Sequence, residues 1–135
     1  NDFDRPILFC GDTIFVSGCG RVFEGTFDQM YESLLKLKSL PDNTEIYCAH
    51  EYTMSNIEFA LKVEPDNINI QDFYDKCSKL RANKLPTVPS TIAQEKITNP
   101  FLRCDNKELR KSISADSSES EKEIFANLRQ WKDIF

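Results

Sequence analysis

The sequence has few of the residues that structural metal sites and disulfide frameworks require. It contains one histidine, and its five cysteines show no C-x-x-C spacing. These counts argue against a zinc finger, because such sites need four ligands at close, paired spacings. The odd number of cysteines argues against a disulfide framework and favours a reducing setting. We expect the thiols to pack as small apolar side chains in a cytoplasmic protein, with a mitochondrial location as the alternative.

Long hydrophobic runs and excess positive charge are also absent. No apolar run approaches the roughly 20 residues that span a bilayer, so no membrane is expected as a partner. The formal net charge is −5, whereas nucleic-acid-binding domains have a basic surface. Nucleic acid is therefore not expected either, although local basic groups still allow a small anionic substrate. Residues 1–6 contain no Met and do not resemble a signal peptide, which predicts the middle of a longer protein.

The first part of the sequence alternates between strand-like and helix-like patterns. Residues 6–10 and 13–16 are short apolar runs bounded by glycine, which predict buried strands. Thr26 and Gln29 form a capping box at the start of an amphipathic helix. Residues 45–49 predict a further strand. Strand, strand, helix and strand in this order predict an α/β layer.

The second part is predicted to be mostly helical. Apolar residues at helical spacing indicate helices around residues 57–61 and 70–80. A proline-stiffened, extended connector follows at residues 85–90 and leads into a short helix. A weaker helix over residues 107–112 precedes a polar segment, residues 112–120, which we expect to be a mobile loop.

The last helix is predicted from its start signal and its apolar stripe. Ser118 and Glu121 are spaced as a capping box. The stripe consists of Ile124, Phe125, Leu128, Trp131 and Phe135. We divide the chain near residue 51, into an α/β part (1–51) and a helical part (52–135).

An aspartate and a histidine follow two of the predicted strands. Asp12 comes after the first strand, and His50 comes after residues 45–49. Open α/β sheets place their sites at the carboxyl ends of strands, so the two side chains are expected near each other. Carboxylate and imidazole suit zinc or iron. Spacing alone is weak evidence, because a catalytic zinc normally needs three protein ligands and such residues are often structural.

Four segments in the chain carry more specific patterns. Residues 9–21 (FCGDTIFVSGCGR) are similar to F-T-G-D-T-L-F-x-x-G-C-G-[KR], and residues 47–53 (YCAHEYT) to Y-C-G-H-E-Y-T. Residues 86–91 (PTVPST) match P-T-V-P-S-T, and residues 99–103 (NPFLR) match N-P-F-[ML]-R. These motifs, in this order and over nearly the whole chain, resemble those of the glyoxalase II (hydroxyacylglutathione hydrolase) family.

The resemblance implies a fold and a reaction. The fold is α/β: the C-terminal half of a metallo-β-lactamase-type αββα sandwich, followed by a mostly helical glutathione-binding domain. The full-length protein would hold two metal ions, zinc and/or iron, with Asp12 bridging both and His50 binding one. A metal-bridging hydroxide would attack the thioester carbonyl of an S-2-hydroxyacylglutathione such as S-D-lactoylglutathione. The family's T-H-x-H-x-D-H motif precedes the G-D-T segment, so we expect this chain to be a fragment, inactive alone and without bound metal.

The same resemblance implies the residues that contact the glutathione thioester. They are Arg21, Phe23 and Tyr52, completed by Arg129 and Lys132 of the last helix. Phe23 stands where tyrosine is frequent in the family, so a hydroxyl contact is lost. Arg129 and Lys132 are three positions apart, and we expect both at the exposed rim of their helix.

Two alternatives to the hydrolase stay open. A persulfide dioxygenase shares the sandwich and uses a single iron, but it is not expected to carry the long helical tail with the basic pair. A non-catalytic module would keep the glutathione-binding helices and lack metal chemistry. An intact T-H-x-H-x-D-H motif upstream would favour the hydrolase, and eroded ligands would favour the module.

Overall fold

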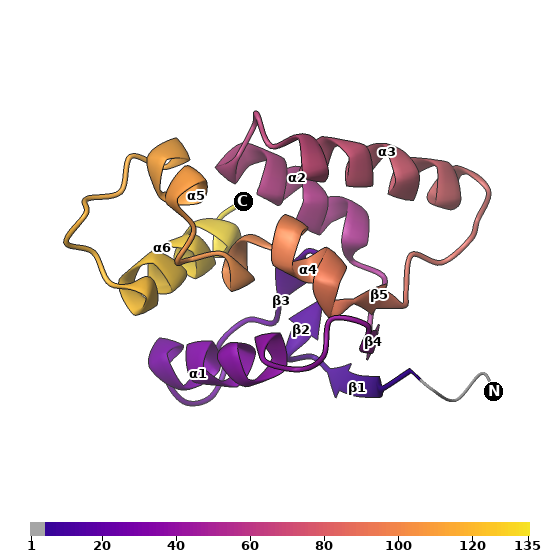
Figure 1. Cartoon of the computed structure of the whole chain (residues 1–135), viewed down its shortest axis with the longest axis horizontal. Coiled ribbons are helices and arrows are strands. Elements are labelled where there is room, and N and C mark those ends of the chain that lie inside the picture. Colours follow the sequence, from indigo (N-terminus) through magenta and orange to yellow (C-terminus); the bar gives the residue numbers. More distant parts are fainter. Residues whose placement is uncertain (1–4) are drawn as a thin grey trace.

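A computed structural model describes residues 5–135, in which a few short strands pack with a larger set of helices (Figure 1). The elements follow the order β1 (Ile7–Gly11), β2 (Ile14–Phe15), β3 (Gly18–Cys19), α1 (Phe27–Lys38), β4 (Glu45–Cys48), α2 (Thr53–Val63), α3 (Ile68–Ala82), β5 (Ser90–Thr91), α4 (Ile92–Thr98), η1 (Pro100–Leu102), α5 (Lys107–Ser112) and α6 (Glu121–Asp133). The α/β class and the mostly helical second part agree with the prediction, and α5 has the predicted bounds.

Two small sheets organise the first part of the chain. The first has the order β1-β4-β5, with β1 parallel to β4 from Ile7↔Glu45 to Gly11↔Cys48. Strands β2 and β3 form a separate antiparallel hairpin, and β3 was not predicted because its glycines suggested only a turn. The predicted burial of residues 6–10 is wrong. The side chains of β1 alternate, and the described residues leave the face with Phe9 and Ile7 largely uncovered, so these two are 80% and 52% exposed.

Side-chain caps determine where the two amphipathic helices begin. The predicted capping box of Thr26 and Gln29 starts α1. The box of α6 is formed by Ser120 and Glu123, so the predicted pair of Ser118 with Glu121 is wrong. The reason is local, because the backbone N–H and the hydroxyl of Ser118 both donate to the carboxylate of Asp116. This turn leaves the serine two positions later to cap the helix.

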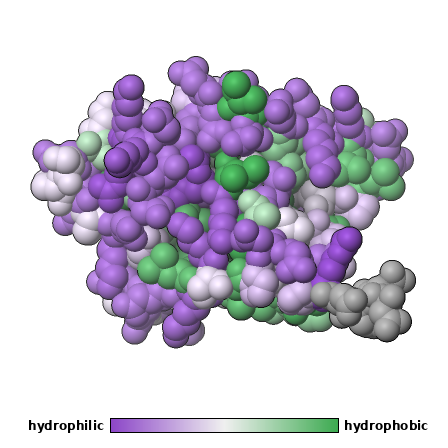
Figure 2. All heavy atoms as spheres, in the orientation of Figure 1, coloured by the Kyte–Doolittle hydropathy of each residue, from purple (hydrophilic) through white to green (hydrophobic). Residues whose placement is uncertain are grey.

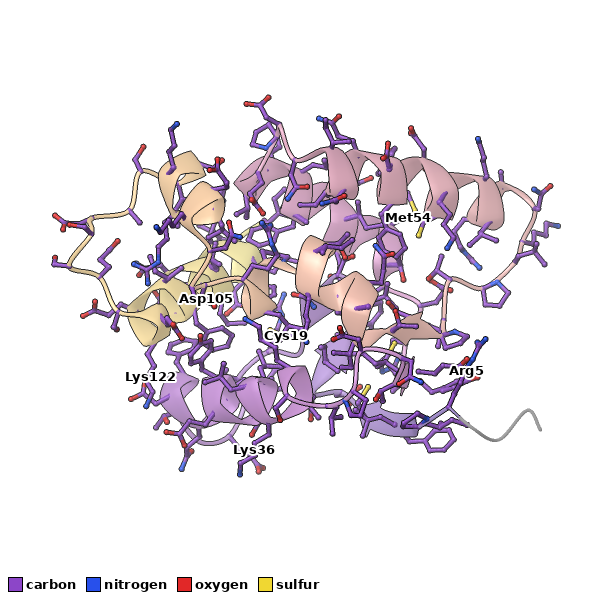
Figure 3. The ribbon with its side chains drawn as sticks, viewed as in Figure 1. Arg5, Cys19, Lys36, Met54, Asp105 and Lys122 are labelled. Atoms are coloured by element: carbon purple, nitrogen blue, oxygen red, sulfur yellow. The ribbon has the colours of Figure 1, made fainter. Side chains whose placement is uncertain are left out.

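The main core draws on both parts of the chain. Leu34 of α1 belongs to the same buried cluster as Phe59 of α2, Phe101 of η1 and Phe125 of α6. The ring of Phe101 lies 6.0 Å from that of Phe59 and 5.9 Å from that of Phe125. Cys19 of β3 is also buried in this cluster, near the centre of the view in Figure 3. The hairpin is therefore packed directly against the helical core.

A second, smaller core lies between the hairpin turn, α2 and α3. It contains Val16, Ile57, Ala60, Ile70, Phe73 and Cys77. The periodicity predicted the inward faces of both helices, since Ile57 and Ala60 of α2 and Ile70, Phe73 and Cys77 of α3 are buried.

The outer surface is mainly hydrophilic. In Figure 2, polar side chains cover most of the visible face, and a group of hydrophobic side chains lies along its lower edge over β1. Within residues 5–135, no helix has the length and apolar character needed to cross a bilayer.

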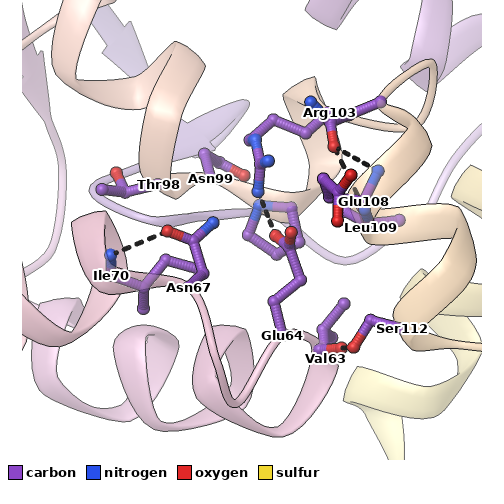
Figure 4. A network of polar contacts seen from close by, with 12 residues as sticks. Val63, Glu64, Asn67, Ile70, Thr98, Asn99, Arg103, Glu108, Leu109 and Ser112 are labelled. Carbon is purple, nitrogen blue, oxygen red and sulfur yellow. Dashed lines mark hydrogen bonds and ion pairs between the residues drawn. The ribbon is translucent and has the colours of Figure 1, made fainter.

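A buried ion pair ties the end of α2 to the segment after η1. The carboxylate of Glu64 accepts a hydrogen bond from the Arg103 guanidinium, as Figure 4 shows. Their side chains are only 5% and 10% exposed. Nearby, the Ser112 hydroxyl donates to the Val63 carbonyl over 2.7 Å and so attaches α5 to the same end of α2. Because both charges of the pair are removed from water, removing either partner would leave the other charge buried without compensation and would destabilise the fold.

We expect Glu64→Ala to lower the free energy of unfolding by about 3–5 kcal/mol, because it leaves the Arg103 charge buried without its partner. Lys122→Ala is the matched control, since it breaks the exposed pair of Lys122 with Glu32 and should change stability far less. Urea denaturation of both variants measures the difference. Equal losses would contradict the account of the buried pair.

Candidate functional site

One pocket of about 510 Å³ is lined by every residue that the sequence analysis assigned to the site. These residues are Asp12, Arg21, Phe23, His50, Tyr52, Arg129 and Lys132. They come from the β1–β2 turn, the segment after β3, the end of β4, the start of α2, and α6. The volume falls in the range of about 300–1,000 Å³ that is typical of small-molecule sites.

The sheet brings Asp12 and His50 together at one edge. Because β1 and β4 are parallel neighbours, the residues that follow them leave the sheet on the same side. Gly11 takes a φ of +53°, which glycine adopts readily, and its carbonyl accepts from the Ala49 N–H over 3.0 Å. The result is a distance of 3.3 Å between His50 Nε2 and Asp12 Oδ1. The expected proximity of the two side chains is confirmed.

The donor chemistry of this pair fits part of a metal site. A carboxylate oxygen and an imidazole nitrogen are ligands for zinc and for iron. Both side chains are open to solvent, with 72% of Asp12 and 49% of His50 exposed, so an ion can reach them. Across residues 5–135, no group of three or more His, Cys, Asp or Glu side chains is arranged to hold a metal ion. Asp12 and His50 are two possible donors, fewer than the three protein ligands that a catalytic zinc normally has.

Aromatic contacts hold the imidazole of His50. Its ring is stacked on that of Tyr52, with centroids 4.8 Å apart and an angle of 10° between the planes. Phe15 meets the Tyr52 ring edge-on at 5.1 Å. Phe23 also lines the pocket and is 86% exposed, so it offers an apolar surface to a ligand.

The proline-rich connector fixes the segment that follows His50. The carboxylate of Glu51 accepts from the Thr87 N–H at 2.5 Å and from the Thr87 hydroxyl at 2.6 Å. Burial opposes the charge of Glu51, but these bonds and one from Thr53 outweigh it and lower the pKa of the carboxyl. Two of the four sequence motifs thus meet through one carboxylate, behind the histidine.

Arg129 is buried, although both basic residues of α6 were expected at the exposed rim. It is 3% exposed, and its Nη1 donates to the carbonyls of Cys19 at 2.7 Å and Gly20 at 3.4 Å. Its Nε and Nη2 donate to Asp133 at 3.1 and 2.8 Å. The rim expectation is wrong for Arg129 because the carbonyls at the end of β3 face α6 and require a donor there. Most of its hydrogen-bonding capacity is used within the protein.

Lys132 and Arg21 are the other two cations that line the pocket. The Lys132 ammonium lies 5.8 Å from the Phe59 ring centroid and 5.6 Å from that of Phe135. Burial, followed by the charges of Arg129 and Arg21, lowers the pKa of Lys132. The Arg21 side chain is 59% exposed, and its Nε is 3.9 Å from Asp133. Clustered cations at one place favour an anionic ligand.

The predicted burial of the thiols is confirmed for three of the five, while Cys10 and Cys48 are half-buried. All five cysteines are free, and Cys19, Cys77 and Cys104 are buried. Burial raises the pKa of Cys10, Cys19 and Cys77 to about 11, which keeps these thiols protonated and poorly nucleophilic near neutral pH.

Several residues line the pocket without having been predicted. Ser55 and Asn56 stand three and four positions after Tyr52 on the first turn of α2, so helical spacing from Tyr52 was the signal that could have found them. Phe15, Cys19 and Gly20 belong to the hairpin, whose course the sequence did not reveal.

Comparison with known proteins gives a consistent result. Residues 51–135 match the family described as "Hydroxyacylglutathione hydrolase C-terminus". The chain is 55% identical over 129 residues to a hydroxyacylglutathione hydrolase of Photobacterium profundum, covering 95% of this chain and 51% of that protein. Proteins of the same name from Shewanella pealeana and Pseudomonas aeruginosa are 52% and 49% identical, over 97% and 98% of this chain and 51% and 52% of their own lengths.

The chain spans about half the length of the curated relatives it matches. The family match itself covers more than half of the chain, and it includes α2 to α6 with Tyr52, Arg129 and Lys132. This chain belongs to the hydroxyacylglutathione hydrolase family.

Proposed function

We propose that the full-length protein containing this chain hydrolyses the thioester of an S-2-hydroxyacylglutathione, such as S-D-lactoylglutathione. The observation that carries the proposal is the shared pocket, in which a carboxylate–imidazole pair and a group of cations lie together. The pair provides metal ligands for the reaction, and the cations provide contacts for an anionic peptide. The names of the relatives favour this hydrolase over a dioxygenase or a non-catalytic module.

Asp12 and His50 would hold two metal ions, zinc and/or iron, together with ligands from outside this chain. When bound, the ions supply Lewis acidity at the thioester carbonyl and lower the pKa of water. The chain's own task is to orient the ligands. The Gly11–Ala49 hydrogen bond fixes the two strand ends, and the Tyr52 ring holds the plane of the imidazole.

Arg21 and Lys132 would bind the carboxylates of glutathione, while Phe23 and Tyr52 line the same space. Arg129 has a different part in the proposal. Its bonds to Cys19 and Gly20 keep the segment that leads to Arg21 against α6, so it shapes the glutathione site from behind. Charge-assisted contacts of this kind are stronger than neutral ones.

We further propose that β1 and β4 belong to a metallo-β-lactamase-type αββα sandwich in the full-length protein. Support comes from the edge strand, where Phe9 and Ile7 are largely exposed although both are apolar. Burying such side chains stabilises a protein by about 1.5–3 kcal/mol each, so a covering layer over this face is favourable. That layer would bring the remaining metal ligands.

In the full-length protein, we expect Asp12→Asn and His50→Ala to lose bound metal and to lower kcat by roughly 100-fold or more. Even residues that only support metal ligands contribute about 10–100-fold. Metal analysis together with steady-state kinetics is the measurement, and Asp75→Asn on α3 is the control. Wild-type turnover at full metal occupancy in either variant would remove that residue from the site.

For the 135-residue chain alone, we expect neither hydrolysis of S-D-lactoylglutathione nor stoichiometric zinc or iron after dialysis. Two donors leave each ion far short of the ligands that hold it tightly. Metal analysis of the dialysed chain tests this. Two tightly held ions in the absence of any partner chain would contradict it.

Lys132→Ala and Arg129→Ala should separate binding from structure. Lys132→Ala is expected to raise KM by about tenfold with kcat nearly unchanged, and added salt should weaken the wild type more than the variant. Arg129→Ala, in contrast, is expected to lower the free energy of unfolding by about 1.5–3 kcal/mol, because the carbonyls of Cys19 and Gly20 lose a charged donor. Kinetics and thermal unfolding decide. An unchanged KM in Lys132→Ala would leave that residue as part of a solvated helix face.

A further inference from the structure

A carboxylate outside the pocket is buried completely. Glu95 of α4 has no exposed surface, and it accepts three hydrogen bonds, from the Ser17 N–H at 2.7 Å, the Ser90 hydroxyl at 2.7 Å and the Asn99 amide at 3.1 Å. Within residues 5–135, no ion pair includes it. Burying an acid without a cationic partner costs free energy unless hydrogen bonds compensate for the lost water. The three hydrogen bonds of Glu95 supply this compensation.

These bonds hold the turn of the β2–β3 hairpin. Ser17 forms the corner with a φ of +60°, a conformation that residues other than glycine rarely adopt. Asn99, which donates to Glu95, also donates to the Gly18 carbonyl at 3.0 Å. The Asn56 amide holds the Val16 carbonyl at 3.2 Å. The backbone of the turn is thus held by side chains of α2, of α4 and of the residue that follows α4.

The other end of the hairpin forms part of the pocket. The carbonyls of Cys19 and Gly20 bind Arg129, and Arg21 follows directly. Gly20 approaches the Asp12 backbone so closely that a Cβ at this position would lie 2.0 Å from the Asp12 carbonyl oxygen. Each strand of the hairpin has only two residues. A displacement of the turn would therefore be transmitted to the backbone at Asp12 and Arg21.

We propose that Glu95 is a positioning residue for the hydrolase site. It fixes the position of the β2–β3 hairpin. Through the hairpin it fixes the contact with Arg129, the place where Arg21 enters the pocket and the backbone of Asp12. Glu95 acts through these groups and touches no substrate. The inference rests on the function proposed above, and it adds a determinant of substrate affinity that lies outside the pocket.

Glu95 also gives the anchor a distinctive pH dependence. Burial raises the pKa of Glu95 from an ordinary value of 4.5 to about 7, although the bonds from Ser90, Ser17 and Asn99 oppose the rise. The titratable groups that face it are the thiols of Cys10, Cys48 and Cys77, whose own pKa values are raised and which stay neutral in this range. The stability that Glu95 contributes is therefore complete below pH 4.5 and is lost as the pH rises through about 7.

The test compares Glu95→Gln, Glu95→Asp and Glu95→Ala in the full-length enzyme with S-D-lactoylglutathione as substrate. Glutamine keeps an oxygen for the Ser17 and Asn99 donors and can donate to the Ser90 hydroxyl, so KM should stay within about twofold of wild type. Its free energy of unfolding, relative to wild type, should increase between pH 4.5 and about 7 and then stay constant. Glu95→Ala should raise KM by about tenfold, and Glu95→Asp, whose carboxylate is one methylene shorter, by a smaller factor.

A purely structural role would change stability and leave KM alone, because KM does not depend on the fraction of enzyme that is folded. Glu64→Ala provides this comparison, since it removes a buried carboxylate that pairs with Arg103, neither of which lines the pocket, and it should keep the wild-type KM. If Lys132→Ala raises KM while Glu95→Ala and Glu95→Asp do not, the inference is overturned and the proposed function stands. Should Glu95→Ala fail to fold, Glu95→Asp alone decides. If neither Lys132→Ala nor the Glu95 variants change KM, the inference and the binding role of Lys132 are both overturned. Only a wild-type enzyme that does not hydrolyse S-D-lactoylglutathione overturns the proposed function.

Discussion

The guanidinium of Arg129 joins two parts of the chain that are 110 positions apart, because it donates from α6 to the Cys19 carbonyl at the end of β3. The contact excludes water, and Asp133 and the Phe101 ring complete the surroundings of the buried charge. The main core, to which α1, α2, η1 and α6 all contribute, includes Cys19 at the same junction. Breaking this contact would weaken the attachment of α6 to the segment after β3 in the wall of the pocket, so it would affect both stability and site geometry.

Two groups of elements form the sides of the pocket. One is the carboxyl edge of β1 and β4, which carries Asp12 and His50. The other is α6 with the segment after β3, which carries Lys132 and Arg21. The hairpin joins them, since Gly20 packs on the Asp12 backbone at the end where Arg129 binds. The Asp12–His50 pair and the two cations are thereby held at a fixed position relative to each other.

Local signals in the sequence predicted most of the helices and strands. The features that were missed depend mainly on contacts between residues that are far apart in the sequence. The proximity of Asp12 and His50 followed from strand order, because parallel neighbours end at one edge. The burial of Arg129 did not, since it depends on carbonyls from a hairpin that had not been predicted. The capping box of α6 was misplaced because two serines had equivalent spacing and Asp116 bound the first. Phe9 and Ile7 of β1 are exposed because the described residues leave their face of the sheet largely uncovered, which the periodicity of one strand cannot reveal.

The central claim is that the metal ligands and the glutathione-binding cations serve one pocket. A crystal structure of the full-length protein with glutathione bound, with its metals located by anomalous scattering, tests this most directly. We predict a glutathione carboxylate within about 3 Å of Arg21 or Lys132. We also predict two metal peaks, with Asp12 touching both and His50 touching one. Glutathione bound elsewhere on the molecule, or metals that touch neither Asp12 nor His50, would contradict the account.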